Sequence, residues 1–340
     1  MNIKTNDYEI FDLGDIKLLS GKVLESAKLA YKTYGTLNAN CDNVVLLPTF
    51  YTGTHKRNEG FFGSGRAIDP NTHFIVSINM FGNGLSSSPS NTPSPHDGPH
   101  FPLITLWDNV ACQHRLLTEH LGVKHIALVT GWSMAGCQAY QWGAQFPDMV
   151  NAILPFCSSA KTSPHNFVFL EGVKSALCAD QNWTDGHYSS PPIKGLKAFA
   201  RVYAGWAFSQ TFYRKELYKK LGFNTIEDLL VDWENDHIKN WDANDLLAKL
   251  ATWQANDISF GPKYENNIQK ALRSIRARTI LISCTQDLYF RPEDNLIEAQ
   301  HIPNAEIRPY DSPWGHCAAN PGNDHGFEVE LDKGIKDLLN

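Results

Sequence analysis

Five short apolar runs, rich in branched side chains, recur along the 340-residue chain, and each of them stops at a loop. Strands that are apolar on both faces belong to a buried, mostly parallel sheet, because a sheet with one wet face shows alternation instead. Helical patterns separate the runs, and the clearest spans residues 106–121. This alternation predicts an α/β fold with a mostly parallel central sheet and helices on both faces. The runs are residues 43–48, 73–78, 125–130, 150–154 and 279–283.

Three segments depart from this rhythm. Residues 8–34 mix short apolar runs with glycines and predict antiparallel strands and turns. Residues 82–102 are rich in Ser, Pro, Asn and Gly, and a loop of that length is usually functional or mobile. Residues 160–262 show helical patterns with many aromatics and no convincing core strand. They predict a helical lid (160–262) inserted into a core domain (1–159 and 263–340), or an ordinary helical segment packed on one face.

Composition excludes several classes of protein. The formal net charge is -6 with no basic block, which argues against a nucleic-acid partner, since such proteins need a positive surface for phosphates. The longest apolar runs are strand-sized, so no membrane span is expected. The first residues lack an apolar stretch and a small-residue cleavage site, so we expect no signal peptide. Seven cysteines, an odd number without C-x-x-C spacing, predict reduced thiols and a cytoplasmic location, with a secreted form holding three bridges as the alternative.

The most informative motif lies where the run at 125–130 passes into a helical pattern. There Gly131-x-Ser133-x-Ala135-Gly136 matches the nucleophile elbow, with Ala at the last small position. The turn from strand to helix is sharp, so side chains two residues before or after the serine collide with neighbouring backbone. Such a motif arises by chance roughly 0.2 to 0.3 times in a chain of this size. The inference of a nucleophile therefore depends on the placement of the motif between a predicted strand and a predicted helix. The alternative is a tight turn with an inert serine.

The position of the elbow also indicates which backbone amides could stabilise the oxyanion that forms during acyl transfer. The helix that follows Ser133 presents its N-terminal amides to the site, so the backbone N–H of Met134 is the first expected oxyanion donor. The second donor should come from the loop after the first parallel strand, residues 48–55. We expect it to be the N–H of Tyr51, with Phe50 as the near alternative.

Chain order identifies the partners of Ser133. In α/β folds with a nucleophile elbow, the three residues of the catalytic triad occur along the chain in the order Ser, Asp or Glu, then His. Asp287 closes the strand predicted at 279–283, and His316 lies on the loop after the last predicted strand, 306–310. His316 is expected to exchange the proton of Ser133, and Asp287 to fix the imidazole tautomer.

Other residues compete for these roles. The rival carboxylates are solvated loop residues in the simplest interpretation, and Ser158 and Ser159 follow a strand without the glycine-helix context. Cys137 lies within the helix after the elbow and is expected to pack. No metal site is predicted, because His96 and His100 lie in a Pro-rich loop, and no nucleotide-binding glycine motif is present. The competing residues for the triad are Asp311, Asp294, His301 and His325.

With these motifs in place, the chain resembles the homoserine O-acetyltransferase family of α/β-hydrolases over nearly its whole length. The resemblance implies a helical lid, a tunnel to the serine, a ping-pong acyl-serine intermediate, acetyl-CoA as a possible acyl donor, and a homodimer formed through the lid. The segments that carry the resemblance are residues 30–38, 52–53, 79–82, 131–136, 146–148, 241–244 and 315–316.

The chain departs from that family at positions that bear on substrate. Family transferases usually have glycines where Trp132 and Ala135 stand, and an Asp directly after the catalytic His, where this chain has Cys317. A neutral thiol does not pair with the ammonium group of homoserine. The family also implies an arginine in the lid for the acceptor carboxylate, for which Arg201 and Arg214 are candidates. Expected substrate contacts are Phe50, Trp132, Arg201 and Cys317.

These inferences predict a serine-dependent acyl-ester hydrolase or acyltransferase in which water is the preferred acceptor of the acyl group. The runner-up is an O-acetyltransferase that carries acetyl from acetyl-CoA to a homoserine-like alcohol. A third hypothesis, from another class, is a catalytically silent α/β-hydrolase used for binding. No cofactor, nucleic acid or membrane partner is expected under any of them.

Overall fold

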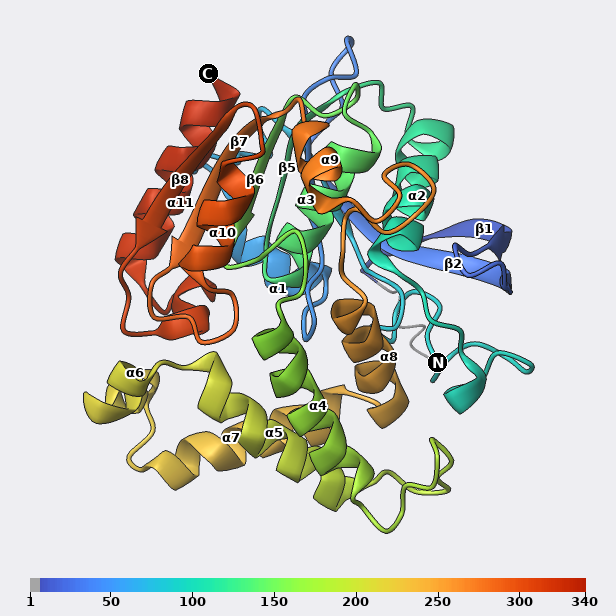
Figure 1. Ribbon diagram of the computed structural model, residues 1–340, viewed down its shortest axis with the longest axis vertical. Helices are drawn as coiled ribbons and strands as arrows, with labels where there is room; N and C mark the ends of the chain where they lie inside the picture. Colours follow the sequence, from blue (N-terminus) through green and yellow to red (C-terminus); the bar gives the residue numbers. More distant parts are fainter. Residues whose placement is uncertain (1–6) are drawn as a thin grey trace.

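The computed structural model describes residues 7–340 and contains one eight-stranded sheet. Its strand order is β1-β2-β4-β3-β5-β6-β7-β8, and the last six positions are parallel while β1 and β2 are antiparallel (Figure 1). The strands are β1 (Glu9–Lys17), β2 (Val23–Tyr34), β3 (Val44–Pro48), β4 (Phe74–Ile78), β5 (Ile126–Trp132), β6 (Ala152–Phe156), β7 (Arg278–Cys284) and β8 (Ala305–Tyr310).

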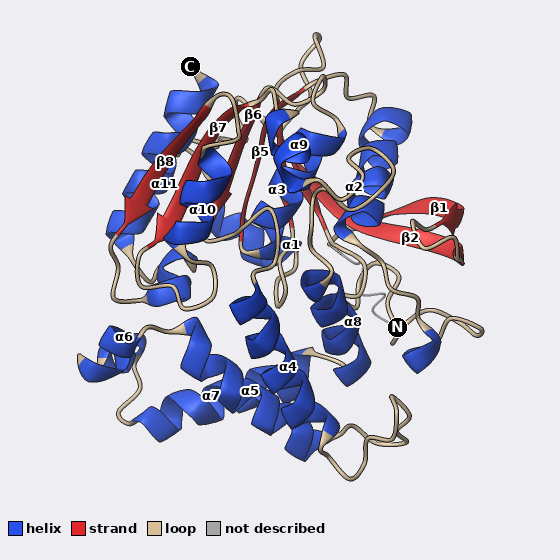
Figure 2. Ribbon diagram, in the orientation of Figure 1, coloured by secondary structure: helices blue, strands red, loops and turns tan. Residues whose placement is uncertain are grey.

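Helices cover both faces of this sheet and also form a separate layer (Figure 2). In chain order they are α1 (His55–Asn58), α2 (Leu106–Arg115), α3 (Met134–Gln145), α4 (Pro164–Cys178), α5 (Ile193–Ala207), α6 (Gln210–Arg214), α7 (Ile226–Asn240), α8 (Ala243–Gln254), α9 (Ile268–Arg273), α10 (Pro292–Ala299) and α11 (His325–Leu339).

The five apolar runs are the central strands β3 to β7. Every residue of β3, β4 and β6 is buried, which is why these segments show no alternation. Residues 8–34 supply the antiparallel pair β1 and β2, and β2 then pairs with β4. The predicted fold class is therefore confirmed.

The helix predicted at 106–121 forms in two parts. It begins at a capping box in which Thr105 and Asp108 satisfy each other's backbone amides, and regular α-helix ends at Arg115. Residues 116–120 continue as a single π-helical turn.

Helices α4 to α8 lie beneath the carboxyl ends of the strands (Figure 2). Aromatic side chains from several of these helices pack against one another, as in the contacts of Tyr203 with Phe169, Phe199 and Trp233. Residues 160–262 contribute no strand to the sheet and form only isolated bridges. The layer therefore stands where the lid is predicted, over the edge where a parallel sheet carries its site.

Loop 82–102 is held by a dense set of hydrogen bonds. Ser86 Oγ donates to the Asn79 carbonyl at 2.6 Å, and Ser90 Oγ donates to Asp245 on α8 at 2.6 Å. The loop therefore joins the core to the helical layer.

The seven cysteines all lie within residues 7–340 and are free, as expected for reduced thiols. In the same part of the chain, no helix combines the length and apolar character that crossing a membrane requires.

A buried carboxylate fixes the point where the chain leaves the sheet for the helical layer. Glu298 on α10 accepts hydrogen bonds from the Ala160 amide at 2.7 Å, from Tyr140 Oη at 2.6 Å and from Asn295 Nδ2 at 2.9 Å. Asn295 Nδ2 in turn donates to the Ser158 carbonyl. Burial raises the pKa of Glu298 from 4.5 to about 7, despite these hydrogen bonds.

This shift predicts a pH dependence of stability that Glu298→Gln removes. The folded state holds the Glu298 proton between pH 4.5 and 7 while the unfolded chain releases it. The contribution to the free energy of unfolding is therefore full below pH 4.5 and lost as the pH rises through 7, a span on the order of 3 kcal/mol. Urea unfolding followed by circular dichroism between pH 4.5 and 8 should show wild type losing stability relative to E298Q by this amount.

Glu293→Gln on the same helix is the matched control. Arg291 lowers the pKa of Glu293. The stability advantage of wild type over E293Q, measured as the free energy of unfolding, should therefore not fall as the pH rises. Parallel curves for wild type and E298Q would contradict the prediction.

Candidate active site

The strand-to-helix corner at Ser133 has the strained geometry predicted from the motif. Ser133 lies between β5 and α3 with φ 60° and ψ −127°, a conformation that costs a residue with a Cβ atom about 1–3 kcal/mol. Its amide donates to the Phe156 carbonyl on β6 at 3.1 Å, which anchors the corner to the sheet. Only 2% of Ser133 is exposed.

Small residues around the serine allow this corner to close. A Cβ atom at Gly131 would lie 2.4 Å from Ala135 Cβ, and one at Gly136 would lie 2.3 Å from Ser158 Oγ. Both distances are far below van der Waals contact, so neither position accepts a side chain without displacement. The elbow forms with Ala135 at its last small position, as expected.

His316 and Asp287 form the pair predicted from chain order. His316 Nδ1 is 2.6 Å from Asp287 Oδ2, although the residues are 29 positions apart. The other carboxylate oxygen, Oδ1, accepts from the amides of Tyr289 at 3.0 Å and Phe290 at 3.1 Å. Asp287 is fully buried, so these three bonds define the direction of its carboxylate and of the imidazole.

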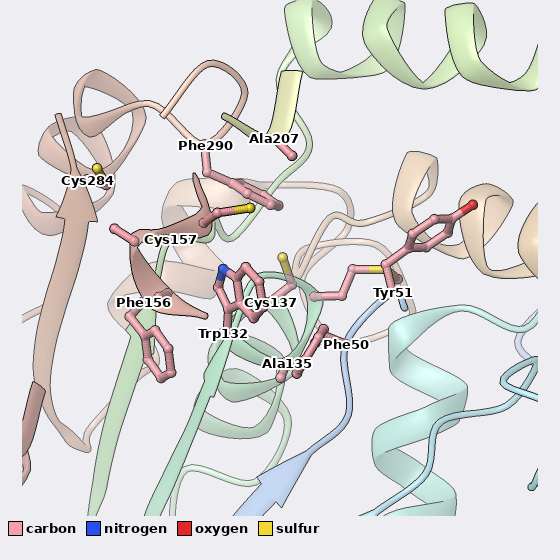
Figure 3. Packing of buried hydrophobic residues seen from close by; sticks show 14 of the residues in the cluster. Phe50, Tyr51, Trp132, Ala135, Cys137, Phe156, Cys157, Ala207, Cys284 and Phe290 are labelled. Carbon is pink, nitrogen blue, oxygen red and sulfur yellow. The ribbon is translucent and has the colours of Figure 1, made fainter. Parts of the chain in front are cut away.

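Aromatic rings surround the imidazole. Its ring centroid lies 4.5 Å from that of Tyr289, 5.1 Å from Trp132 and 5.6 Å from Phe290. Figure 3 shows Trp132 at the end of β5, with Phe50 and Tyr51 at the end of the neighbouring strand. These walls limit the access of water to the pair and favour polar interactions within it.

The competing residues lie elsewhere. Asp311 accepts from Thr285 Oγ1 and Gln286 Nε2 on the surface, and Asp294 lies in the first turn of α10. The side chain of His325 is 90% exposed. Neither His301 nor His325 lines the cavity that contains Ser133.

Ser133 and His316 line the same cavity of about 770 Å³ between the sheet and the helical layer. Four further residues predicted at the site line it too, namely Phe50, Tyr51, Trp132 and Cys317. Met134 follows Ser133 directly as the first residue of α3. The structure thus brings together the parts that the sequence placed far apart, from residue 50 to residue 317.

Backbone amides near the serine are left without a protein acceptor in the described chain. They include the N–H groups of Met134, Phe50, Tyr51 and Thr52, whereas Thr49 and Gly53 do donate. An amide in this state at a helix N-terminus or a tight loop is suited to bind an anionic oxygen. The two expected oxyanion donors are therefore available, and Phe50 stays open as the alternative to Tyr51.

Four consecutive carbonyl groups of the same loop, those of residues 49–52, are held by donors. Those of Thr49, Phe50, Tyr51 and Thr52 accept hydrogen bonds, in that order, from Gln138 Nε2, Gly53 N, Lys249 Nζ and Arg57 Nη1. Each peptide of the loop is thereby fixed in orientation before a substrate arrives, as oxyanion stabilisation requires.

Lys249 brings this support from the helical layer. Its side chain is fully buried on α8, its Nζ lies 2.5 Å from the Tyr51 carbonyl oxygen, and the Trp241 ring centroid is 3.8 Å away. Tyr51 Oη donates back to the Leu246 carbonyl on the same helix at 2.9 Å. Burial lowers the pKa of Lys249 to about 7.

Comparison with known proteins agrees with this geometry. The family described as the alpha/beta hydrolase fold matches residues 42–319. The chain belongs to the α/β-hydrolase family.

Relatives within this family extend over nearly the whole chain. An ethyl acetate hydrolase from Pseudomonas veronii is 35% identical over 98% of this chain and 95% of its own length. A homoserine O-acetyltransferase from Chlorobium chlorochromatii is 30% identical over 94% of this chain and 91% of its own. The crystal structure of an acetylester hydrolase from Corynebacterium glutamicum is 33% identical, superposes with a TM-score of 0.94, and covers 98% of this chain and 95% of that one. The resemblance to homoserine O-acetyltransferases inferred from the motifs is thus confirmed.

The arginines expected at the substrate site are not there. Arg201 on α5 is bonded to Glu227 and to Glu234 on α7, so its charge is already paired. Neither Arg201 nor Arg214 lines the cavity. The expectation that Arg201 contacts substrate is therefore wrong, because two carboxylates of a neighbouring helix hold it on the lid surface.

Arg57, which the sequence did not single out, does line the cavity. It lies on the short helix α1, directly after the loop that carries Phe50 and Tyr51. The sequence shows that Arg57 is six residues after Tyr51. That position alone does not indicate that its side chain faces the cavity.

Cys317 lies where homoserine O-acetyltransferases usually have Asp. Burial raises the pKa of its thiol to about 12, so the group is neutral at pH 7 and offers an ammonium ion no counter-charge.

A metal ion does not fit the buried group of Cys157, Asp287 and His316. Their ligand atoms lie within 4.8 Å of one another, but the Asp287 and His316 atoms are hydrogen-bonded at 2.6 Å. Tetrahedral zinc with ligands at ordinary bond lengths needs them roughly 3.3 Å apart. The two side chains instead form a direct hydrogen bond, which leaves no space for an ion between them.

The crowded elbow predicts a sharp difference between two glycines. Gly136→Ala must displace Ser158 or the Gly131 carbonyl, so we expect a loss of about 1–3 kcal/mol in unfolding free energy together with loss of esterase activity. Gly172 on α4 is exposed and its Cβ position meets nothing within 4 Å, so Gly172→Ala should stabilise the protein by about 0.5–1 kcal/mol. Chemical denaturation and an ester assay on both variants test this, and equal effects would contradict it.

Proposed function

We propose that the protein is a carboxylic ester hydrolase that acts through an acyl intermediate on Ser133, with water as the acceptor. The observation that supports this most directly is the bond of 2.6 Å between His316 and Asp287 in a cavity that Ser133 also lines. A strained serine, an oriented imidazole and amides without acceptors are the parts that acyl transfer needs.

The reaction follows from these positions. Ser133 Oγ attacks the ester carbonyl while His316 takes its proton, and Asp287 stabilises the imidazolium that forms. The carbonyl oxygen becomes an oxyanion held by the amides of Met134 and Tyr51, each donor contributing about 3 kcal/mol to the transition state. His316 then protonates the departing alcohol. Water, activated by the same imidazole, releases the acid and restores Ser133.

The substrate class that the relatives favour is a short acyl ester. The similar proteins named an ethyl acetate hydrolase and an acetylester hydrolase cover almost the full chain. The cavity is larger than an acetyl ester needs, so the size of the alcohol or acyl part is not restricted by volume alone.

The alternative activity is O-acetyl transfer from acetyl-CoA to a homoserine-like alcohol, supported by the 30% identity to a homoserine O-acetyltransferase. Against it stands Cys317, whose neutral thiol occupies the position of the expected acidic residue. No cofactor is part of either reaction, since acetyl-CoA would be a substrate.

Ser133→Ala tests the nucleophile. Removing the hydroxyl should lower turnover of 4-nitrophenyl acetate by roughly a million-fold, as for other serine nucleophiles. Ser159→Ala is the control, because Ser159 also follows a strand but donates to the Lys161 carbonyl. Fluorophosphonate labelling of wild type should modify Ser133. An unreactive Ser133 would favour a binding protein instead, and near-normal turnover in S133A would show that Ser133 is not the nucleophile.

The acceptor is tested by competition. Wild-type enzyme supplied with acetyl-CoA and homoserine should form little O-acetylhomoserine, because the neutral thiol of Cys317 offers no counter-charge to the homoserine ammonium group. The same enzyme should release acetate from short esters. Mass spectrometry of both products measures the partition. Rapid O-acetylhomoserine formation would establish the transferase instead.

The proposal includes a homodimer formed through the helical layer. The outer helices of this layer carry exposed apolar side chains. Among them are Phe167 and Val168 on α4, and Val168 is 64% exposed. A cytoplasmic location stays a prediction from the sequence.

A further inference from the structure

A guanidinium group faces the cavity beside the proposed nucleophile. Arg57 lines the same cavity as Ser133 and His316, and its Cζ lies 5.4 Å from the ring centroid of Trp132, the residue directly before the serine. The Phe50 ring centroid is 5.3 Å away on the oxyanion loop. Arg57 therefore lies between the two segments that would hold the reacting carbonyl.

Only neutral groups hold this arginine. Nε and Nη2 share the Asn320 side-chain oxygen at 3.2 and 2.7 Å, and Nη1 donates to the Thr52 carbonyl at 3.3 Å. Within residues 7–340 no carboxylate lies within 4 Å of it, in contrast to Arg66, which is paired with Asp332 at 3.0 Å. A guanidinium has five N–H groups, so two remain available.

The surroundings make this unpaired charge costly in the free protein. Arg57 is exposed and lines the cavity, and desolvation by the surrounding protein lowers its pKa. An arginine nevertheless stays charged at neutral pH. A cation whose hydrogen bonds all go to neutral acceptors gains a charge-assisted interaction when an anion binds beside it.

The other charged groups of the cavity lie on the helical layer. Asp232 and Asp236 on α7 line it, and Asp236 favours the charged form of Arg57 from a distance. These carboxylates repel an anion from their own side. The cavity therefore has one cationic position, on the core side near the serine, and acidic positions on the lid side.

From this arrangement we propose that Arg57 is a substrate-binding residue, and that the preferred substrates are esters carrying a carboxylate within reach of its two available N–H groups. A planar carboxylate accepts two parallel bonds from a guanidinium, which gives both affinity and orientation. The inference rests on the proposed hydrolase function and adds the charge of its substrate.

Matched ester pairs test the inference and locate the carboxylate. In the acyl arm, 4-nitrophenyl hemisuccinate is compared with its neutral methyl-capped form. In the alcohol arm, acetoxyacetate is compared with acetoxyacetamide. Wild type should favour the anionic member of at least one pair in kcat/KM, and the arm that shows it identifies the end of the ester that carries the carboxylate.

Three variants separate the charge from the fold. Arg57→Met should lower the anionic-to-neutral ratio of kcat/KM at least tenfold, mainly through KM. Arg57→Lys should retain part of the ratio, because lysine keeps the positive charge but cannot donate two parallel N–H bonds to one carboxylate. Lys56→Met is the control, because Lys56 is the adjacent cation but pairs with Asp7 outside the cavity, so its ratio should match wild type. Circular dichroism melts confirm that each variant is folded.

The outcomes are distinguishable from failure of the proposed function. If wild type hydrolyses the esters but shows no anionic preference, or if R57M changes both members of a pair equally, the Arg57 proposal is overturned and the hydrolase stands. If wild type releases no acid from any ester and S133A behaves identically, the hydrolase proposal fails, and the Arg57 proposal fails with it.

Discussion

The chemistry of this molecule depends on how closely α3 approaches β5 and β6 at one corner. Ser133 adopts a positive φ because the turn between strand and helix is too tight for a relaxed one, and the turn is that tight because Gly131 and Gly136 present no side chain to Ala135 and Ser158. The sheet stabilises the strained residue through the bond between its amide and the Phe156 carbonyl. The strain is thus maintained by packing on all sides, which is how disfavoured backbone persists at functional sites.

Around this corner, hydrogen bonds set the orientation of the Asp287 carboxylate, the His316 imidazole and the oxyanion loop. Asp287 uses one oxygen for two amides and the other for His316. The oxyanion loop uses its carbonyls for four separate donors, and the amides of Tyr51 and Met134 remain free. Preorganised groups of this kind need little rearrangement during reaction, which is where their catalytic value lies.

Sequence reasoning reached most of the fold and the pairing of Asp287 with His316 near Ser133, and it failed where partners come from distant segments. The buried strands were predictable because burial on both faces removes alternation, and Ser133, Asp287 and His316 because chain order and a local motif mark them. Arg201 looked available in the sequence, but Glu227 and Glu234 on another helix hold it. Nothing in the sequence marked Arg57, because Asn320, the residue that holds it beside the cavity, is 263 residues away.

Lys249 shows why the helical layer belongs to the site and does not merely cover it. Its ammonium group reaches the Tyr51 carbonyl from α8, and Tyr51 Oη reaches back to the Leu246 carbonyl, so helix and loop hold each other through two bonds. A buried lysine is stable here because the Trp241 ring and the carbonyl replace part of its hydration. Movement of α8 away from the sheet breaks both bonds and frees the Tyr51–Thr52 peptide, which directly follows the peptide that presents the second amide. The orientation of the oxyanion loop therefore depends on the docking of the helical layer.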